Sequence, residues 1–320
     1  MVQLSIIIPT RNRSTLLRKT LESILEQTFP KTDFEVIVND NGSTDDTKAV
    51  VESFANKIPN LIYHYDEKPG LHVGRHNGYK LSHSEILGYA DDDIEAFPTW
   101  LEGIYESFSD PNVMLVGGKD LPKYEQAPPF WVEEQWYNIT NIGHVYGALS
   151  LIDLGNDIIP ISPFYVYGCN YSIRKKIIKE AGGFHPDGVP FSMIEYRGDG
   201  EFYMNKYIFE QGYKVIYNPK ASVYHIVTKD RMTIDYLKRR AFRSGVEKSY
   251  ADKRYSSFRR NISQVLQRIK TTCLNVFCRE EMSEYSKQIK ESFRIGYKYH
   301  DYKYKHSKEL RNWVHQENYF

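Results

Sequence analysis

Short apolar runs alternate with amphipathic stretches along the first 90 residues. The apolar runs of strand length cover residues 4–8, 34–38, 61–65 and 86–90, and apolar positions recur at helical spacing over residues 14–27 and 45–54. This alternation predicts an α/β fold with a mostly parallel, Rossmann-like sheet and helices on both of its faces. Ligands of such sheets bind beyond the carboxyl ends of the strands, so the polar residues that follow each run are the first candidates for a site.

Three consecutive carboxylates, Asp91, Asp92 and Asp93, follow the apolar run 86–90 directly. Like charges at the end of a buried strand repel one another and lose hydration unless a cation offsets them. Mg²⁺ and Mn²⁺ take hard oxygen ligands and often share them with substrate phosphates, so the motif predicts a metal and phosphate site. An acidic turn after an edge strand is the alternative interpretation. Thr10-Arg11 and Asp40 follow two other runs, and we expect them on the same edge.

The pattern changes twice in the rest of the chain. Residues 121–163 are irregular and rich in proline and aromatic residues, after which the spacing predicts two further strands, within 165–174 and 213–217, and two helices, at 175–181 and 201–211. After Lys229 the composition shifts to lysine, arginine and tyrosine at helical spacing. We therefore expect a catalytic domain over residues 1–228 and a basic, aromatic-rich helical C-terminal region over residues 229–320.

Charge is divided unevenly between these two parts. Residues 1–228 hold 20 Lys and Arg against 30 Asp and Glu, a balance of −10, whereas residues 229–320 hold 22 against 11, a balance of +11. A basic helical stretch with interleaved aromatic residues suits an anionic membrane surface, and packing against the acidic body is the alternative. No known nucleic-acid-binding motif accompanies the charge, so nucleic acid is not expected as a partner.

The sequence shows neither a membrane-spanning run nor a leader pattern, and we therefore expect a cytoplasmic protein. Peripheral contact with the inner face of the membrane is the alternative. No run approaches the roughly 20 apolar residues that span a bilayer, and residues 1–10 enter a strand pattern without a charged and apolar leader. The three cysteines, Cys169, Cys273 and Cys278, fit neither a disulfide framework nor a zinc site, and we expect them to be reduced packing residues.

Several residues of the predicted rim suit a nucleotide. Asp40 can accept hydrogen bonds from a base or ribose, Arg75 can form charge-assisted bonds to phosphate, and the aspartates can hold a metal between phosphoryl oxygens. No GxGxxG follows the first run and no GxxxxGK[ST] occurs in the chain, which argues against a dinucleotide-binding fold and a P-loop.

Ten motifs in order carry a resemblance to a known family. They are SIIIPTRNR at 5–13, VNDNGSTDDT at 38–47, GLHVGRHNG at 70–78, DDD at 91–93, FPTWLE at 97–102, GG at 117–118, GCNYSIRK at 168–175, GGF at 182–184, GDGEF at 198–202 and NPKASVYH at 218–225. With these motifs the chain resembles the inverting family 2 glycosyltransferases of GT-A fold, over about 70% of its length.

The resemblance implies a set of site residues. Donor binding would involve Pro9, Thr10, Arg11, Asp40, Arg75, Asp91 and Asp92; the metal, Mn²⁺ or Mg²⁺, would bind Asp93 and, as in some members, His225. Asp199 matches the catalytic carboxylate that takes the acceptor's proton, and Glu201, two residues on, is the alternative base. Three positions depart from the family pattern: Asn39 stands for an acidic residue, Gly198 for a glutamate and His76 for an asparagine.

These observations predict a metal-dependent inverting glycosyltransferase of hexosyltransferase type. It would move a sugar from a nucleotide-diphosphate donor, UDP-linked by our expectation, to the hydroxyl of a glycan or lipid-linked acceptor in polysaccharide or glycoconjugate synthesis. Trp131 and Trp136 are candidates to stack on an acceptor sugar, with burial in the core as the equal alternative. Two rival functions are a nucleotidyltransferase that uses the same aspartates and a non-catalytic glycan- or lipid-binding module.

Overall fold

The computed structural model describes residues 2–255 and 280–320. Its main sheet has eight strands in the order β11-β13-β6-β12-β4-β1-β2-β3. Parallel pairing joins β1 to β2 and β4, β2 to β3, and β6 to β13, while β12 runs antiparallel to both of its neighbours. The strands are β1 (Leu4–Thr10), β2 (Phe34–Asp40), β3 (Leu61–Tyr65), β4 (Ile86–Ala90), β6 (Val113–Gly117), β11 (Ile159–Pro160), β12 (Asn170–Arg174) and β13 (Lys214–Tyr217).

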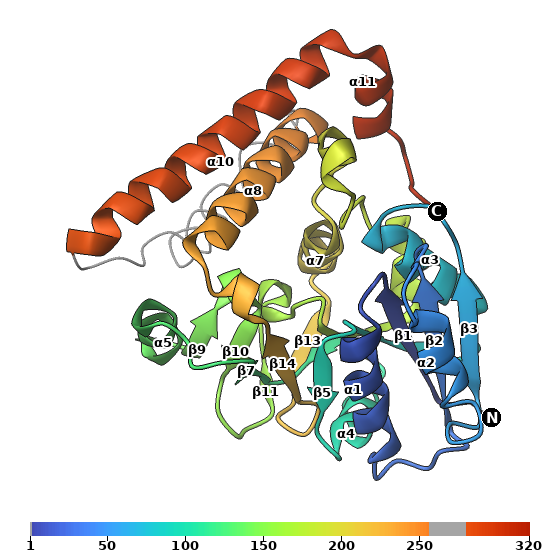
Figure 1. The fold of residues 1–320 in the computed structure, drawn as a ribbon. Coiled ribbons are helices and arrows are strands. Elements are labelled where there is room, and N and C mark those ends of the chain that lie inside the picture. The colour runs from blue at the N-terminus through green and yellow to red at the C-terminus, as the bar shows by residue number, and fades with distance from the viewer. Residues whose placement is uncertain (1, 256–279) are drawn as a thin grey trace.

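Helices cover both faces of this sheet, as the sequence predicts. Side chains of a strand point alternately to its two faces, and β1 places Ile6 and Ile8 in one apolar cluster and Ile7 in another. The first cluster includes residues of α1 (Ser14–Leu25), α2 (Thr47–Glu52) and α4 (Trp100–Ser107); the second includes residues of α6 (Lys175–Ala181) and α7 (Glu201–Glu210) and packs against α3 (Leu71–Leu81). The core therefore lies on both sides of the central strands (Figure 1).

A second sheet, which the sequence pattern did not indicate, lies beside the first. Its order is β5-β14-β7-β10-β9-β8. Four of these strands, β7 to β10, and the helix α5 lie almost entirely in the stretch expected to be irregular. The bounds are β5 (Ile94–Ala96), β7 (Asp120–Tyr124), α5 (Phe130–Tyr137), β8 (Ile139–Thr140), β9 (Gly143–Tyr146), β10 (Leu151–Asp153) and β14 (Val223–Val227). Strands of two to five residues with interrupted alternation give little periodic signal, which explains why this sheet escaped prediction.

The C-terminal region is helical, as expected, and packs on the rest of the molecule. It begins with the turn η4 (Lys229–Arg231) and continues with α8 (Ile234–Arg254), α10 (Glu280–His306) and α11 (Lys308–Val314), of which α8 and α10 lie side by side (Figure 1). Arg197 joins α8 to the part of the chain before residue 229 through Glu247 at 2.5 Å. None of the helices in the described ranges has the length and apolarity to cross a membrane. Cys169 is free and buried, while Cys273 and Cys278 lie outside the described residues.

Candidate active site

The rim expected at the ends of β1, β2 and β4 is present. Thr10 and Asp40 are direct partners in the β1–β2 register, and the Thr10 hydroxyl donates to Asp92 at 2.7 Å. Asp40 accepts from the backbone N–H of Ser43 at 2.7 Å and from the Tyr63 hydroxyl at 2.8 Å. Pro9 lies in β1, and Arg11 is exposed just beyond its end. The structure thus places these residues on one edge, and their contacts to a donor stay predictions.

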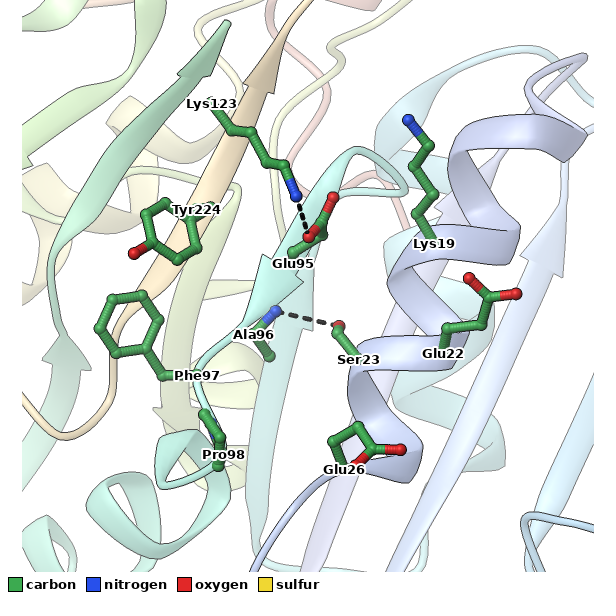
Figure 2. A pocket seen from close by; sticks show the side chains of 10 residues that line it. All are labelled: Lys19, Glu22, Ser23, Glu26, Glu95, Ala96, Phe97, Pro98, Lys123 and Tyr224. Carbon is green, nitrogen blue, oxygen red and sulfur yellow. Dashed lines mark hydrogen bonds and ion pairs between the residues drawn. The ribbon is translucent and has the colours of Figure 1, made fainter. Parts of the chain in front are cut away.

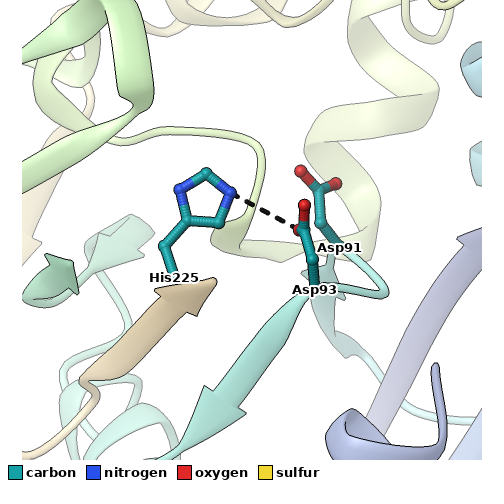
Figure 3. A group of neighbouring side chains, drawn as sticks. All are labelled: Asp91, Asp93 and His225. Atoms are coloured by element: carbon teal, nitrogen blue, oxygen red, sulfur yellow. Dashed lines mark ion pairs between the residues drawn. The ribbon is translucent and has the colours of Figure 1, made fainter. Parts of the chain in front are cut away.

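Asp91, Asp93 and His225 form a cluster with one ligand atom from each within 4.8 Å of the other two (Figure 3). Asp91 and Asp93 follow β4, whereas His225 comes from β14 of the second sheet. The Nδ1–H of His225 donates to the Leu149 carbonyl at 2.9 Å, which directs Nε2 toward the carboxylates, 3.4 Å from Asp93 Oδ1 (Figure 3). Asp93 Oδ1 is buried and accepts no hydrogen bond from the described residues. Two carboxylates and an imidazole nitrogen in this arrangement fit a divalent cation.

The electrostatics of this cluster also favour a bound cation. Burial raises the pKa of Asp91, and the charge of Asp93 raises it further. Burial also favours a raised pKa for Asp93, but His225, Arg13 and Arg231 outweigh it and hold that pKa well below its usual range. Burial raises the pKa of Asp92 to about 7 although Arg13 opposes the shift. Burial makes the negative charge of these carboxylates costly, and a divalent cation would offset that cost.

Two arginines that the sequence analysis did not select belong to this site. Arg13 contacts Asp92 at 2.7 Å and Asp93 at 2.6 Å. Arg231, six residues after His225, contacts both His225 and Asp93. Arg13 lies within the first motif, three residues beyond β1, so its position was a usable signal. Arg231 comes from the junction with the C-terminal region, and no local pattern marks it.

Arg75 pairs with Glu201, which begins α7. The two side chains are 3.2 Å apart, and the Gly168 N–H donates to the second oxygen of Glu201 at 3.2 Å. A Cβ on Gly168 would lie 2.1 Å from Glu201 and 2.3 Å from Arg75, so the pair requires glycine there. Burial raises the pKa of Glu201, Arg75 opposes this, and Asp187 and Asp91 add to it. Glu201 therefore lies in the electrostatic reach of the aspartate cluster, with a side chain that is 29% exposed.

Asp199 has different surroundings although it is only two residues away. Its Oδ1 accepts from His185 at 2.6 Å and its Oδ2 from the Tyr255 hydroxyl at 3.1 Å, and its side chain is 4% exposed. Tyr255 follows the C-terminal end of α8, whereas Arg231, the partner of Asp93, precedes its N-terminal end. A helix of 21 residues at about 1.5 Å per residue separates these ends by roughly 31 Å. Asp199 and the metal cluster thus face opposite ends of α8.

His76, the departure from asparagine, has a structural explanation. Its Nδ1 contacts the Tyr319 carbonyl at 3.1 Å, its Nε2 accepts from the Phe184 N–H at 2.8 Å, and its ring lies against Phe320 with centroids 4.6 Å apart. Burial lowers the pKa of His76 to about 3, so the ring is neutral. The residue attaches the last part of the C-terminal region to α3, the helix that carries Arg75.

The two tryptophans proposed for acceptor stacking are buried. Trp131 and Trp136 lie in α5 and pack in an apolar cluster that also contains residues of β10 and α8. This burial is what the core alternative expects, and a stacking role for either tryptophan stays a prediction.

A groove of about 680 Å³ lies between α1 and the second sheet (Figure 2). Tyr224 lines it, and because neighbouring residues of a strand point to opposite faces, the groove and the metal cluster are separated by β14. Its Lys123 is paired with Glu95 at 2.5 Å, and Phe97 packs on Tyr224. The groove holds none of the candidate donor or metal residues, and we assign it no part in catalysis.

The fold and the aspartate-histidine cluster at the strand ends define a GT-A type protein. The profile of Glycosyl transferase family 2 matches residues 5–182, more than half of the chain, and the protein belongs to that family. It is therefore a glycosyltransferase.

Similar proteins include two from Haloferax volcanii. The chain is 25% identical to a glucosyl-dolichyl phosphate glucuronosyltransferase over 74% of its length and 72% of that protein's. It is 38% identical to glycosyltransferase AglE over 36% of its length, and this match spans 38% of AglE. A mannosyltransferase of Pyrobaculum calidifontis, solved with GDP-Man and Mn²⁺, superposes with a TM-score of 0.59 at 17% identity, over 98% of this chain and 83% of that one. At this identity the last likeness supports the fold alone.

Proposed function

We propose that this protein is a metal-dependent inverting glycosyltransferase that uses a nucleotide-diphosphate sugar, with UDP as the expected nucleotide. The observation that carries the proposal is the cluster of Asp91, Asp93 and His225 at the rim, in which His225 Nε2 is directed toward the carboxylates and Asp93 Oδ1 accepts no hydrogen bond from the described residues. A divalent cation bound there would neutralise charge on the departing diphosphate. The mannosyltransferase of similar fold held Mn²⁺ with its nucleotide sugar, in agreement with this choice of metal.

The residues of the rim would orient the donor. Asp40, at the end of β2, is buried and keeps acceptor capacity for a base or ribose hydroxyl. Arg75 is held by Glu201 and the Gly168 carbonyl at the second turn of α3. Its fixed positive charge would stabilise the negative charge that develops on the leaving group.

Glu201 is our choice for the general base, rather than Asp199. The Glu201 side chain is partly exposed and lies within the electrostatic reach of Asp91, whereas the Asp199 side chain is buried and held by His185 and Tyr255. The acceptor hydroxyl would give its proton to Glu201 as its oxygen forms the bond to the anomeric carbon. The bond from that carbon to the diphosphate breaks in the same step, and the nucleoside diphosphate leaves with the electron pair.

For the acceptor we propose a chemical class. A relative is named as acting on a glucosyl-dolichyl phosphate, which supports a lipid-linked or glycan acceptor for this chain. Contact of the basic C-terminal region with an anionic membrane surface would suit such an acceptor. Membership of a glycosyltransferase family argues against the nucleotidyltransferase alternative.

A donor screen tests the proposal. Each nucleotide sugar is incubated with the protein and Mn²⁺ or Mg²⁺, and released nucleoside diphosphate is measured with and without candidate acceptors. We expect release with one donor, loss of release in excess chelator, and a product of inverted anomeric configuration by NMR. Asp93→Asn should reduce the rate by at least about 10³-fold, because a charged ligand is lost. Release of pyrophosphate would indicate a nucleotidyltransferase, and binding of glycan without any release would indicate a non-catalytic module.

A further inference from the structure

Arg231 places a positive charge between two of the candidate metal ligands. Its Nη1 lies 2.9 Å from His225 Nε2 and 3.1 Å from Asp93 Oδ2. The guanidinium has hydrogen-bond donors only, so His225 Nε2 must be the acceptor. This agrees with the proton on Nδ1, which is donated to the Leu149 carbonyl. Arg231 therefore uses the lone pair with which His225 would bind a metal.

Arg13 does not compete in this way. It contacts Asp92 Oδ1 and Asp93 Oδ2 and leaves Asp93 Oδ1 open. A cation on Asp93 Oδ1 and Asp91 is therefore compatible with Arg13 as it stands. The same cation takes His225 Nε2 only if Arg231 withdraws, because one lone pair serves one partner.

The surroundings of Arg231 allow such a withdrawal. It is the last residue of the η4 turn, between β14 and α8, and its side chain is 19% exposed. Among the described residues its other hydrogen-bond partner is Tyr236, whose hydroxyl accepts from Nε at 3.3 Å. A nucleoside diphosphate entering with the metal brings oxygens that match the planar donor fork of arginine.

We propose that Arg231 is an exchangeable counter-cation, which occupies the His225 and Asp93 ligands in the empty site and moves to the diphosphate when metal and nucleotide bind. The competition with metal stands on the contacts above. The transfer to diphosphate rests on the proposed function.

The proposal predicts that Arg231→Gln strengthens Mn²⁺ binding and weakens nucleotide binding. Mn²⁺ affinity is measured by electron paramagnetic resonance or calorimetry, without nucleotide, for the full chain, Arg231→Gln, Arg231→Lys and the control Lys229→Gln. Lys229 lies exposed in the same turn, so its substitution removes an equal charge from outside the site. We expect Arg231→Gln to bind Mn²⁺ about tenfold more tightly, Arg231→Lys to show a smaller gain, and Lys229→Gln to match the parent.

The second measurement adds UDP and GDP in the presence of Mn²⁺. Arg231→Gln should bind its preferred nucleotide about tenfold more weakly than the parent, because a charge-assisted phosphate contact is lost. Thermal melting verifies that each variant is folded, and Arg231→Lys supplies the answer if Arg231→Gln is not.

The outcomes separate this proposal from the one on which it rests. If Asp93→Asn abolishes Mn²⁺ binding while Arg231→Gln and Arg231→Lys bind Mn²⁺ as the parent does or more weakly, the exchange is wrong and the metal site stands. If neither the parent nor the arginine variants bind Mn²⁺, both proposals are overturned. Tighter Mn²⁺ binding without weaker nucleotide binding confirms the competition and overturns the transfer to diphosphate.

Discussion

The two ends of α8 face two kinds of carboxylate site. Before its N-terminal end, Arg231 contacts Asp93 and His225 in a cluster where one oxygen of Asp93 accepts no hydrogen bond from the described residues. After its C-terminal end, Tyr255 contacts Asp199, whose oxygens are both satisfied by His185 and tyrosine. The first arrangement is incomplete without a ligand, and the second is complete. This difference supports our proposal that the reaction takes place at the first site and that Asp199 has a structural role.

Replacing Glu201 and Asp199 by the corresponding amides gives the largest expected difference in turnover. Glu201→Gln should lower turnover by about 10²–10⁴-fold, the usual contribution of a general base, while donor affinity changes little. Asp199→Asn should stay within about tenfold of the parent. Steady-state kinetics with the donor found in the screen give the measurement, and nucleotide binding by calorimetry is the control for folding. An inactive Asp199→Asn beside an active Glu201→Gln would return the role of base to Asp199.

The pH profile sharpens the assignment of Glu201. A base must be deprotonated, so kcat/KM should fall as pH decreases through the Glu201 pKa, which burial raises above its ordinary value. Arg75 lowers that pKa, so Arg75→Gln should move the acid limb upward by about one pH unit. An acid limb that is unchanged in Arg75→Gln would show that the limiting group is another residue.

Substitutions of Asp199 and its partner Tyr255 should lower the stability of the fold. Asp199→Asn should destabilise the fold by about 1–3 kcal/mol, because a buried acceptor for two donors is weakened. Tyr255→Phe should cost about 0.5–1.5 kcal/mol, since Asp199 keeps His185. Urea unfolding measures both values. A stability unchanged in both variants would contradict a structural role for this cluster.

Much of the fold and the rim followed from the sequence. The runs at β1 to β4 were long and regular enough to predict strands, and parallel pairing placed Thr10, Asp40 and the aspartates on one edge. The second sheet was missed because its strands are short. Sequence patterns also could not reveal that Glu201 pairs with Arg75 while Asp199 pairs with His185, because only the tertiary fold brings these residues together. Arg231 was missed for a similar reason, because only the tertiary fold brings it to Asp93.

The smallest expected effect concerns the basic C-terminal region. Several of its cations already have partners, for example Lys303 with Glu195 at 3.7 Å and Arg240 with the Gly147 carbonyl at 3.1 Å, which supports packing on the acidic body. Phe258, Arg259 and Arg260, which contributed to the membrane prediction, lie outside the described residues. We expect weak cosedimentation with anionic vesicles that disappears near about 0.5 M salt, where screening acts within a few ångströms. No cosedimentation at low salt would exclude the membrane contact.

The attachment of His76 to Tyr319 joins residues 243 positions apart, and this separation affects the order of folding. During synthesis, the strands and helices around α3 emerge long before residues 319 and 320 do. Until then the His76 ring lacks its carbonyl partner and the cover of Phe320, and is open to water and to protonation. The wall of the proposed donor site that carries Arg75 thus reaches its final form late in synthesis. Contacts of such long range also slow folding, so refolding of activity should lag behind the formation of secondary structure.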